Sequence, residues 1–157
     1  MNQSSPLKVL MSILHKKKMD QHSKKKVKIM RSSGLDLTTK QRKMIYDFVN
    51  FVYDSLNLTG DYKCYLSANR KSAGIKTTAV CAYSEKRISV YCKERALADI
   101  LRSIAHEMFH LRQHELNIVP YDMPPHHLNP IEWEANIAAG SMLSYFAQMV
   151  GRNQVYE

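Results

Sequence analysis

Apolar residues recur at helical spacing between Leu35 and Gly60, and they mark the first ordered element that the sequence predicts. The apolar side of this segment consists of Met44, Ile45, Phe48, Val49 and Val52. Thr38 precedes Gln41 by three positions, which is the spacing of a capping box at the start of a helix. The run from Leu58 to Gly60 ends the pattern. We therefore expect an amphipathic helix that begins beside Thr38.

Three short runs rich in β-branched and aromatic residues follow and predict strands. They are YKCYLS at 62–67, TTAVCAY at 77–83 and RISVYC at 87–92. The last two flank SEKR, which indicates a hairpin, whereas ANRKSAGIK is typical of a loop between the first two. The runs together predict a small, mostly antiparallel sheet.

Helical periodicity returns from about Lys93 onward. The apolar side of this second helix comprises Leu97, Leu101, Ile104, Ala105 and Met108. Projection at 100° per residue puts His106 and His110 on the opposite side. The helix is therefore expected to pack one side on the core and to present both histidines from the other.

The proline-rich segment IVPYDMPPHHLNP is expected to form a loop. A last helix follows from about Pro130 to Met149, with Asn129 as its cap and the proline in its first turn. The predicted order is helix, strands, helix, helix. The fold class is therefore α+β, with a small sheet, a histidine-bearing helix and a C-terminal helix.

The formal net charge of +9 resides almost entirely in the first part of the chain. Residues 1–31 hold nine Lys or Arg against the single acid Asp20, which leaves 14 Lys or Arg and 13 acids in the rest. Like charges repel one another and few apolar residues are available to form a core. Residues 1–35 are therefore expected to be a basic, flexible tail, and 36–157 the folded domain. The lysines of the tail suit nucleic acid or an acidic partner.

The three cysteines, Cys64, Cys81 and Cys92, form no CxxC pair, which favours reduced thiols in a cytoplasmic compartment. Lys8 interrupts the first apolar patch, so no secretory signal is expected. The longest apolar stretch, IAAGSMLSYFAQMV, is too short for a membrane span and contains Ser and Gln. The sequence thus predicts a cytoplasmic protein without a membrane partner.

The second helix contains HEMFH, with His106 and His110 four residues apart. Side chains at this spacing project side by side, so both imidazoles can bind one zinc ion at about 2.0–2.1 Å. Glu107 points in a neighbouring direction, where it can contact a water beside the ion. This division of roles is that of HExxH metallopeptidases. His114 continues the same side, but it lies about 12 Å along the helix from His106 and cannot share the ion.

A catalytic zinc needs a third protein ligand, and two sources remain open. One is an imidazole, from His126 or His127, and the other is a carboxylate of the last helix. On the helical wheel Glu132 falls at the edge of the inward apolar stripe, whereas Glu134 falls outside it and is expected to be solvated. Burial of Glu132 costs several kcal/mol unless a cation compensates it. Asn136, one turn later, can hydrogen-bond a ligand histidine.

The residues IAHEMFHL, followed by IEWEANIAAGSML, resemble the ImmA/IrrE-type metallopeptidases of phages and mobile elements. The pattern of that family is HExxH and then a helix with an ExxAN-like signature and small residues. The resemblance covers about 88–149 and implies a compact, minimal zincin-like domain. It also implies zinc ligands at His106, His110 and Glu132, with Glu107 as the catalytic base. A phage-encoded protein of this family would act in the cytoplasm of its host.

The same resemblance implies that Asn136 supports a ligand histidine. A second resemblance is to SprT-like proteases, which use a third histidine after HExxH and act near DNA. His127 lies in a suitable region for that ligand, and the basic tail suits a location on DNA. Tyr121, Arg112 and His127 are candidate contacts to a substrate oxyanion, and Glu134 is the alternative carboxylate ligand.

These features predict a zinc-dependent peptidase that acts on proteins or peptides, with Glu107 as general base. The TTAVCAY region is expected to hold the substrate as an added strand. The rival hypothesis is a non-catalytic protein in which zinc is structural or absent and the basic tail binds nucleic acid or an acidic partner. The sequence indicates no oligomeric state.

Overall fold

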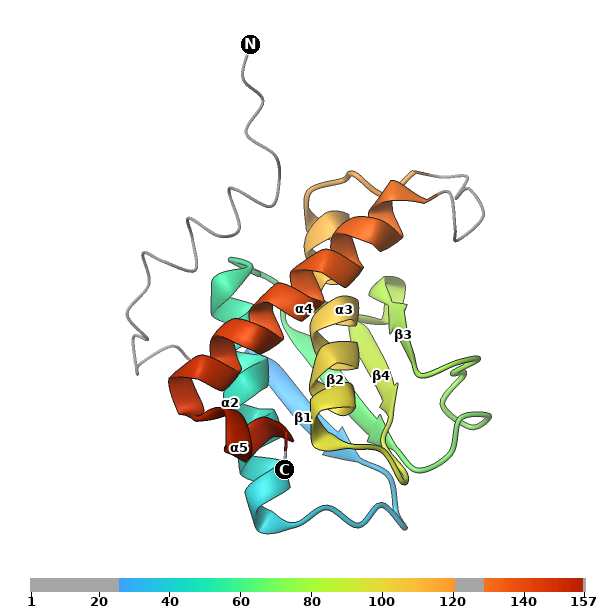
Figure 1. Cartoon of the computed structure of the whole chain (residues 1–157). Coiled ribbons are helices and arrows are strands. Elements are labelled where there is room, and N and C mark those ends of the chain that lie inside the picture. The colour runs from blue at the N-terminus through green and yellow to red at the C-terminus, as the bar shows by residue number, and fades with distance from the viewer. Residues whose placement is uncertain (1–25, 121–128, 157) are drawn as a thin grey trace.

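The computed structural model describes residues 26–120 and 129–156, and four strands in it form one mixed sheet in the order β1-β2-β4-β3 (Figure 1). The strands are β1 (Val27–Arg31), β2 (Tyr62–Ser67), β3 (Ala79–Ala82) and β4 (Arg87–Tyr91). β1 and β4 both run parallel to β2, whereas β3 runs antiparallel to β4. The α+β class and the hairpin are confirmed.

The expectation of a mostly antiparallel sheet is wrong, and the connections explain why. A helix carries the chain back between β1 and β2, which makes these two strands parallel. The hairpin then places its second strand, β4, beside β2 and leaves β3 at the edge. Strand pairing of this kind depends on contacts between distant residues, which local patterns do not report.

Strand β1 also corrects the predicted domain boundary, because Val27–Arg31 falls within the segment expected to be a flexible tail. Val27 and Ile29 pack on the helices, and the two cations of the strand, Lys28 and Arg31, are exposed. The lysine-rich composition around β1 therefore led to the prediction of a flexible tail where a half-buried strand forms. The rest of the predicted tail, residues 1–25, lies outside the described residues.

The predicted helices form with the expected caps. α2 (Thr39–Ser55) begins at a complete capping box, in which Gln41 N donates to Thr38 Oγ1 at 3.1 Å and Thr38 N donates to Gln41 Oε1 at 2.9 Å. α3 (Leu97–Glu115) carries HEMFH. α4 (Pro130–Val150) begins where the Asn129 side chain accepts a hydrogen bond from Ile131 N, and α5 (Arg152–Tyr156) follows it.

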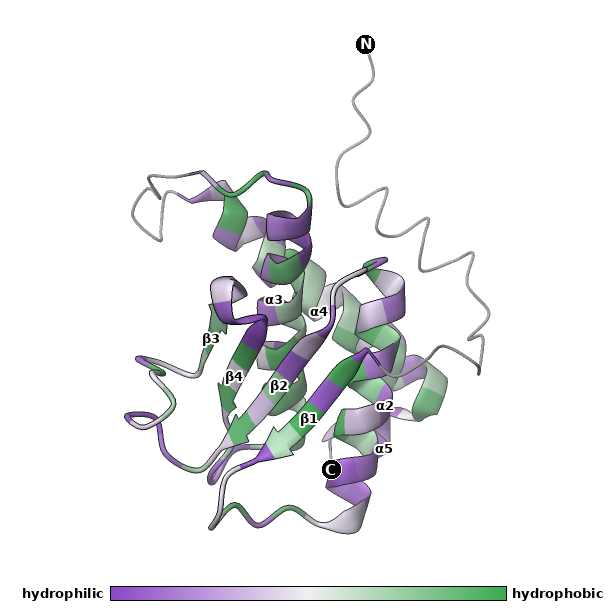
Figure 2. Ribbon diagram, turned by 180° about the vertical axis from the view of Figure 1, so that it is seen from behind, coloured by the Kyte–Doolittle hydropathy of each residue, from purple (hydrophilic) through white to green (hydrophobic). Residues whose placement is uncertain are grey.

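The helices lie on one face of the sheet, and no helix of the described residues covers the other (Figures 1 and 2). The core between the layers includes fully buried Phe48, Leu101, Met142 and Phe146. Phe48 of α2 meets Phe146 of α4 edge to face, with ring centroids 5.0 Å apart. None of the helices in the described part of the chain is both long and apolar enough to cross a membrane.

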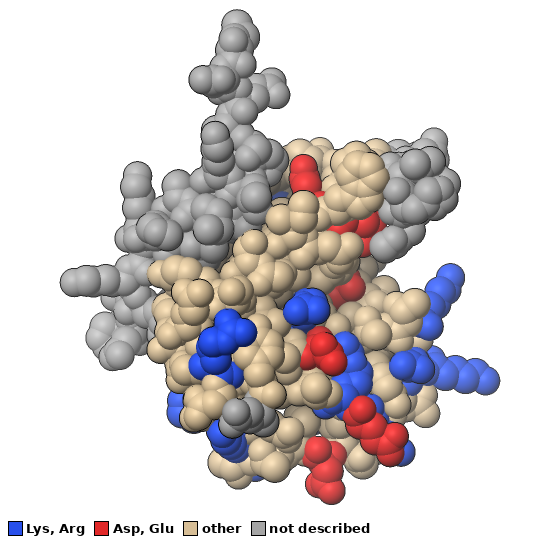
Figure 3. All heavy atoms as spheres, viewed as in Figure 1, with Lys and Arg blue, Asp and Glu red and all other residues tan. Residues whose placement is uncertain are grey.

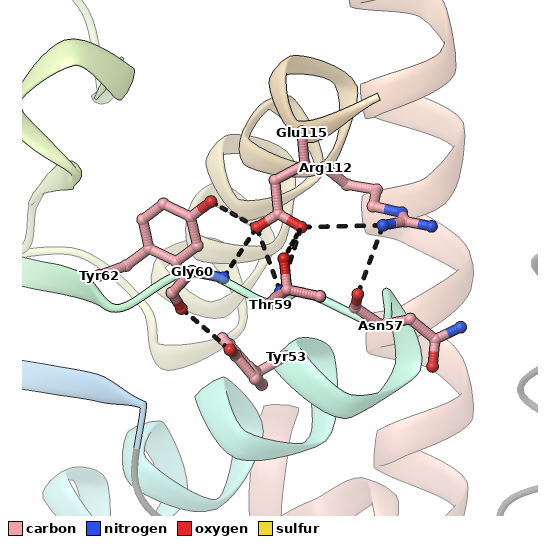
Figure 4. A network of polar contacts seen from close by, with 7 residues as sticks. All are labelled: Tyr53, Asn57, Thr59, Gly60, Tyr62, Arg112 and Glu115. Carbon is pink, nitrogen blue, oxygen red and sulfur yellow. Dashed lines mark hydrogen bonds and ion pairs between the residues drawn. The ribbon is translucent and has the colours of Figure 1, made fainter. Parts of the chain in front are cut away.

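The C-terminal end of α3 is anchored to the loop that leads into β2 (Figure 4). Glu115 accepts hydrogen bonds from Thr59 N at 3.1 Å and Gly60 N at 3.2 Å, and from the Tyr62 hydroxyl. Burial favours a higher pKa for the Glu115 carboxyl, but these hydrogen bonds, led by that of Tyr62, outweigh it and lower the pKa. Glu115 is thus a charged anchor that fixes the helix bearing HEMFH.

Candidate metal centre

Two imidazoles and one carboxylate converge where α3 and α4 meet. The Nε2 atoms of His106 and His110 lie 3.0 Å apart. Glu132, in the first turn of α4, places Oε2 3.0 Å from His106 Nε2 and Oε1 3.0 Å from His110 Nε2. These three residues form the group of potential metal ligands that the described residues contain. The third residue of this group, Glu132, is the glutamate that the helical wheel placed at the edge of the inward apolar stripe.

The spacing of these atoms fits a zinc ion. Ligands about 2.05 Å from a tetrahedral zinc lie roughly 3.3 Å from one another, close to the 3.0 Å separations here. His₂Glu with one open position is also a donor set of catalytic zinc sites. The residues present therefore fit the ion in both geometry and chemistry.

The hydrogen bonds of Gln113 determine which nitrogen of His110 carries the proton. Its Nε2 donates to Ile131 O at 3.0 Å, so its Oε1 faces His110 Nδ1 at 2.7 Å and accepts the proton of that nitrogen. The Nε2 of His110 is then an acceptor, and it faces a Glu132 oxygen that is also an acceptor. Two acceptors at 3.0 Å repel each other unless a proton or a metal cation lies between them.

A second support residue holds the other histidine. The side chain of Asn136, one turn after Glu132 on α4, hydrogen-bonds His106, as the sequence predicted. Gln113 was not predicted, although its position three residues after His110 places it on the same side of α3. Hydrogen bonds of this kind orient ligand histidines and strengthen metal binding.

Glu107 lies beside the ligands in a desolvated position. Its side chain is buried and lines the same cleft as His106 and His110. Burial, and then the charge of Glu132, raise the pKa of the Glu107 carboxyl to about 8. A cation at the His–Glu group acts in the opposite direction and favours the carboxylate. Glu107 therefore has the surroundings of a proton-transfer group.

The cleft above these residues has a volume of about 550 Å³, within the range of ligand sites. Its walls are α3 and α4 on one side and, on the other, the segment from Thr77 to Cys81, which includes most of edge strand β3. Arg102, one turn before His106, contributes a cation to the wall and was not predicted as a site residue. The site is therefore an open cleft between two helices and a strand edge.

The remaining candidates lie outside the ligand group. His114 stacks on Tyr83 with centroids 4.5 Å apart and reaches only the wall of the cleft, which agrees with the prediction that it does not share the ion. Glu134 is partly buried, and its Oε2 lies 3.4 Å from Gln113 Nε2. The expectation that Glu134 is simply solvated is thus wrong, because the Gln113 amide draws it inward.

Arg112, predicted as a candidate contact to a substrate oxyanion, lies elsewhere in the structure. Its guanidinium donates to Asn57 O at 3.3 Å and lies near Glu115 (Figure 4), and Arg112 is not among the described residues that line the cleft. An oxyanion role for Arg112 is therefore wrong. The other candidates for such contacts, Tyr121 and His127, lie outside the described residues, as does His126, so these assignments stay predictions.

Comparison with protein-family models, with curated proteins and with solved structures finds no significant match to this chain.

Proposed function

We propose that this protein is a zinc-dependent peptidase. The observation that carries the proposal is the convergence of His106, His110 and Glu132 at 3.0 Å spacings, beside buried Glu107, in a cleft along a strand edge. When bound there, a zinc ion lowers the pKa of a coordinated water toward about 7 and polarises a substrate carbonyl. The ImmA/IrrE-type resemblance of the motif residues supports the same conclusion.

Glu107 is the proton-transfer residue of this proposal. Its carboxylate accepts a proton from the attacking water as the new C–O bond forms, and it returns that proton to the amine nitrogen as the C–N bond breaks. His106 and His110 keep their orientation through Asn136 and Gln113, respectively. The chain thus supplies positioning and proton transfer from α3 and α4 alone.

The edge of β3 favours an extended peptide as the substrate. Tyr91 N donates to Thr78 O at 2.9 Å, so these opposed residues are a hydrogen-bonded pair of the antiparallel ladder. Bonding alternates along such a ladder, which turns the N–H and C=O groups of Ala79 and Cys81 toward the free edge. Because that edge lines the cleft, a peptide can add as a further strand beside the metal ligands.

The deciding experiment combines metal content with peptide hydrolysis. The wild type is expected to bind one zinc per chain and to cleave members of a fluorescence-quenched peptide library. Glu107→Gln should keep the zinc and lose at least about 100-fold in turnover, because it removes the proton acceptor. Glu134→Gln is the matched control and should retain both properties.

Three results would contradict the proposal. Stoichiometric zinc in Glu132→Ala would show that this carboxylate is not a ligand. Unchanged hydrolysis by Glu107→Gln would show that the activity arises elsewhere. Zinc binding without hydrolysis of any library member, in the wild type and the variant alike, would favour the non-catalytic alternative.

A further inference from the structure

The face of the sheet that carries no helix is a second surface with its own chemistry (Figure 2). The buried residues Cys64, Leu66, Ile88 and Val90 point toward the helices, so the alternate positions of the strands point away from them. We call this surface the open face. On this face Lys28, Met30 and Lys63 are exposed, Tyr65, Arg87 and Tyr91 are partly buried, and Ser67 and Ser89 are buried.

Three cations lie side by side across the open face. Lys28 is paired in register with Lys63, and Lys63 with Arg87, so they are about 4.8 Å apart from strand to strand. The four strands contain no Asp or Glu, whereas the helix-bearing side shows both charges close together (Figure 3). Like charges in register destabilise a sheet, so an anionic ligand would relieve the repulsion.

One carboxylate touches this row from outside the strands. Glu85 Oε2, in the hairpin turn, binds Arg87 Nη2 at 2.7 Å; Glu85 is exposed and Arg87 is partly buried. Arg87 Nε has no hydrogen-bond partner among the described residues. Lys26, directly before β1, is also exposed. The cations of the open face therefore outnumber the acid that binds Arg87.

Aromatic rings lie next to the cations. Tyr65 is the register partner of Ser89, and Tyr91 lies two residues further along β4. The two tyrosines are thus diagonal neighbours, with Cα atoms roughly 7–8 Å apart. The guanidinium of Arg70 lies over the Tyr91 ring, 4.3 Å from its centroid, and Met30 beside Tyr65 is 37% exposed. The face therefore carries two partly exposed aromatic side chains beside its cations, and a guanidinium lies over one of the two rings.

We propose that the open face binds single-stranded nucleic acid. Bases stack on Tyr65 and on the Arg70–Tyr91 pair, and the backbone phosphates contact Lys28 and Lys63. Cations alone would suit any polyanion, but aromatic rings beside them select unstacked bases over a lipid surface or an acidic peptide. A broad sheet face also fits a single strand better than the groove of a duplex, which admits a helix or a narrow ribbon.

The test is fluorescence anisotropy with the full chain and a labelled 12-nucleotide single strand of DNA or RNA, at two salt concentrations. The variant Tyr65→Thr/Tyr91→Thr keeps good strand formers and removes both rings. It should lose about tenfold or more in affinity at both salt concentrations. Tyr65→Phe/Tyr91→Phe keeps the stacking surfaces and should bind as the wild type does. Tyr156→Ala, at an exposed tyrosine of α5, is the matched control.

The cations are tested through the salt dependence. Lys28→Gln/Lys63→Gln should reduce the slope of log affinity against log salt by about 1.4, since each phosphate contact on a single strand contributes about 0.7. Lys40→Gln/Lys43→Gln changes two exposed lysines of α2, on the helix-bearing side, and should leave the slope near that of the wild type. Thermal midpoints of all variants check the fold.

Three results would overturn the proposal. One is unchanged binding by the threonine double variant. Another is equal affinity for duplex or inorganic polyphosphate that does not depend on the tyrosines, which would indicate a simple polyanion surface. The third is binding to anionic phosphatidylserine vesicles without binding to the oligonucleotide. Peptide hydrolysis does not enter any of these measurements, so the outcome is independent of the proposed peptidase function.

Discussion

Gln113 Oε1 lies 2.7 Å from His110 Nδ1, and the same amide donates to Ile131 O, one residue before Glu132. One side chain therefore fixes the imidazole of α3 and the backbone of α4 at the point where the proposed ligands meet. Gln113 is almost fully buried, with 1% of its surface exposed. Its two hydrogen bonds join the two helices that supply the metal ligands.

The first prediction concerns Gln113. Gln113→Leu keeps the approximate volume but removes the acceptor for His110 Nδ1, so zinc affinity should fall by about 10- to 100-fold. Gln113→Glu retains an acceptor and should lose much less. Competition with a chromogenic chelator measures both affinities. Gln148→Leu, at an exposed position of α4, is the control. Equal affinities in Gln113→Leu and the wild type would mean that the amide has only a packing role.

The second prediction follows from the short distance between two hydrogen-bond acceptors, His110 Nε2 and Glu132 Oε1. In Glu132→Gln, an amide NH₂ replaces one carboxylate oxygen and can donate to a histidine Nε2. The zinc-free variant should therefore unfold at the same temperature as the zinc-free wild type or higher. Zinc at 100 times its Kd should raise the wild-type midpoint by about 5–10 °C, since it contributes about 2.7 kcal/mol. It should leave the variant nearly unchanged.

Differential scanning calorimetry with and without a chelator measures these midpoints. Glu134→Gln is the control, because this carboxylate lies outside the ligand group, and it should keep the zinc-dependent rise. A zinc-free Glu132→Gln protein that is clearly less stable than the zinc-free wild type would contradict the electrostatic argument.

Elements with local signals could be predicted from the sequence. The capping box at Thr38 and the cap at Asn129 fixed two helix starts, and the periodicity of α3 placed His106 and His110 together. Glu132 was separable from Glu134 because only its position meets the inward stripe of α4. In each case the deciding information lies within one or two helical turns.

Features that depend on distant contacts were missed. The sequence of β1 belongs to a lysine-rich segment, which predicts a flexible tail. Only its pairing with β2, more than 30 residues later, identifies it as a strand. Gln113 gains its role from the Ile131 carbonyl, 18 residues away. Arg112 was misplaced because the turn after α2 brings the Asn57 carbonyl, 55 residues away in the chain, within reach of its guanidinium.

The third prediction is acid sensitivity at Glu115. Its folded-state pKa is lowered, so its contribution to stability is fully present above its unfolded pKa of about 4.3 and is lost as the pH falls through the lower folded value. Glu115→Gln should cost about 1–3 kcal/mol near pH 7, since it weakens hydrogen bonds to a charged group. The difference from the wild type should shrink below about pH 4.

Urea unfolding at pH 7, 5 and 3 measures this effect, within the range where the wild type remains folded. Glu94→Gln alters an exposed glutamate before α3 and should show no such dependence on pH. A cost of Glu115→Gln that stays constant from pH 7 to pH 3 would indicate that lost packing, rather than the charge, destabilises the variant.

The last prediction tests the edge of β3 with two neighbouring prolines. The N–H of Ala79 points to the free edge, so Ala79→Pro removes one hydrogen bond to an added peptide strand and leaves the pairing with β4 intact. Catalytic efficiency, kcat/KM, for a peptide should fall about 2- to 10-fold, the value of one such hydrogen bond. Val80→Pro instead removes a hydrogen bond within the ladder and leaves its acceptor unsatisfied, which should cost about 1–3 kcal/mol of folding stability. Thermal unfolding and peptide kinetics on the two variants separate these effects.

The N–H of Ala79 points to the free edge, whereas that of the next residue, Val80, points to β4. Equal losses of stability in both variants would therefore show that proline disturbs β3 as a whole. Unchanged kcat/KM in a stable Ala79→Pro protein would place the substrate elsewhere in the cleft.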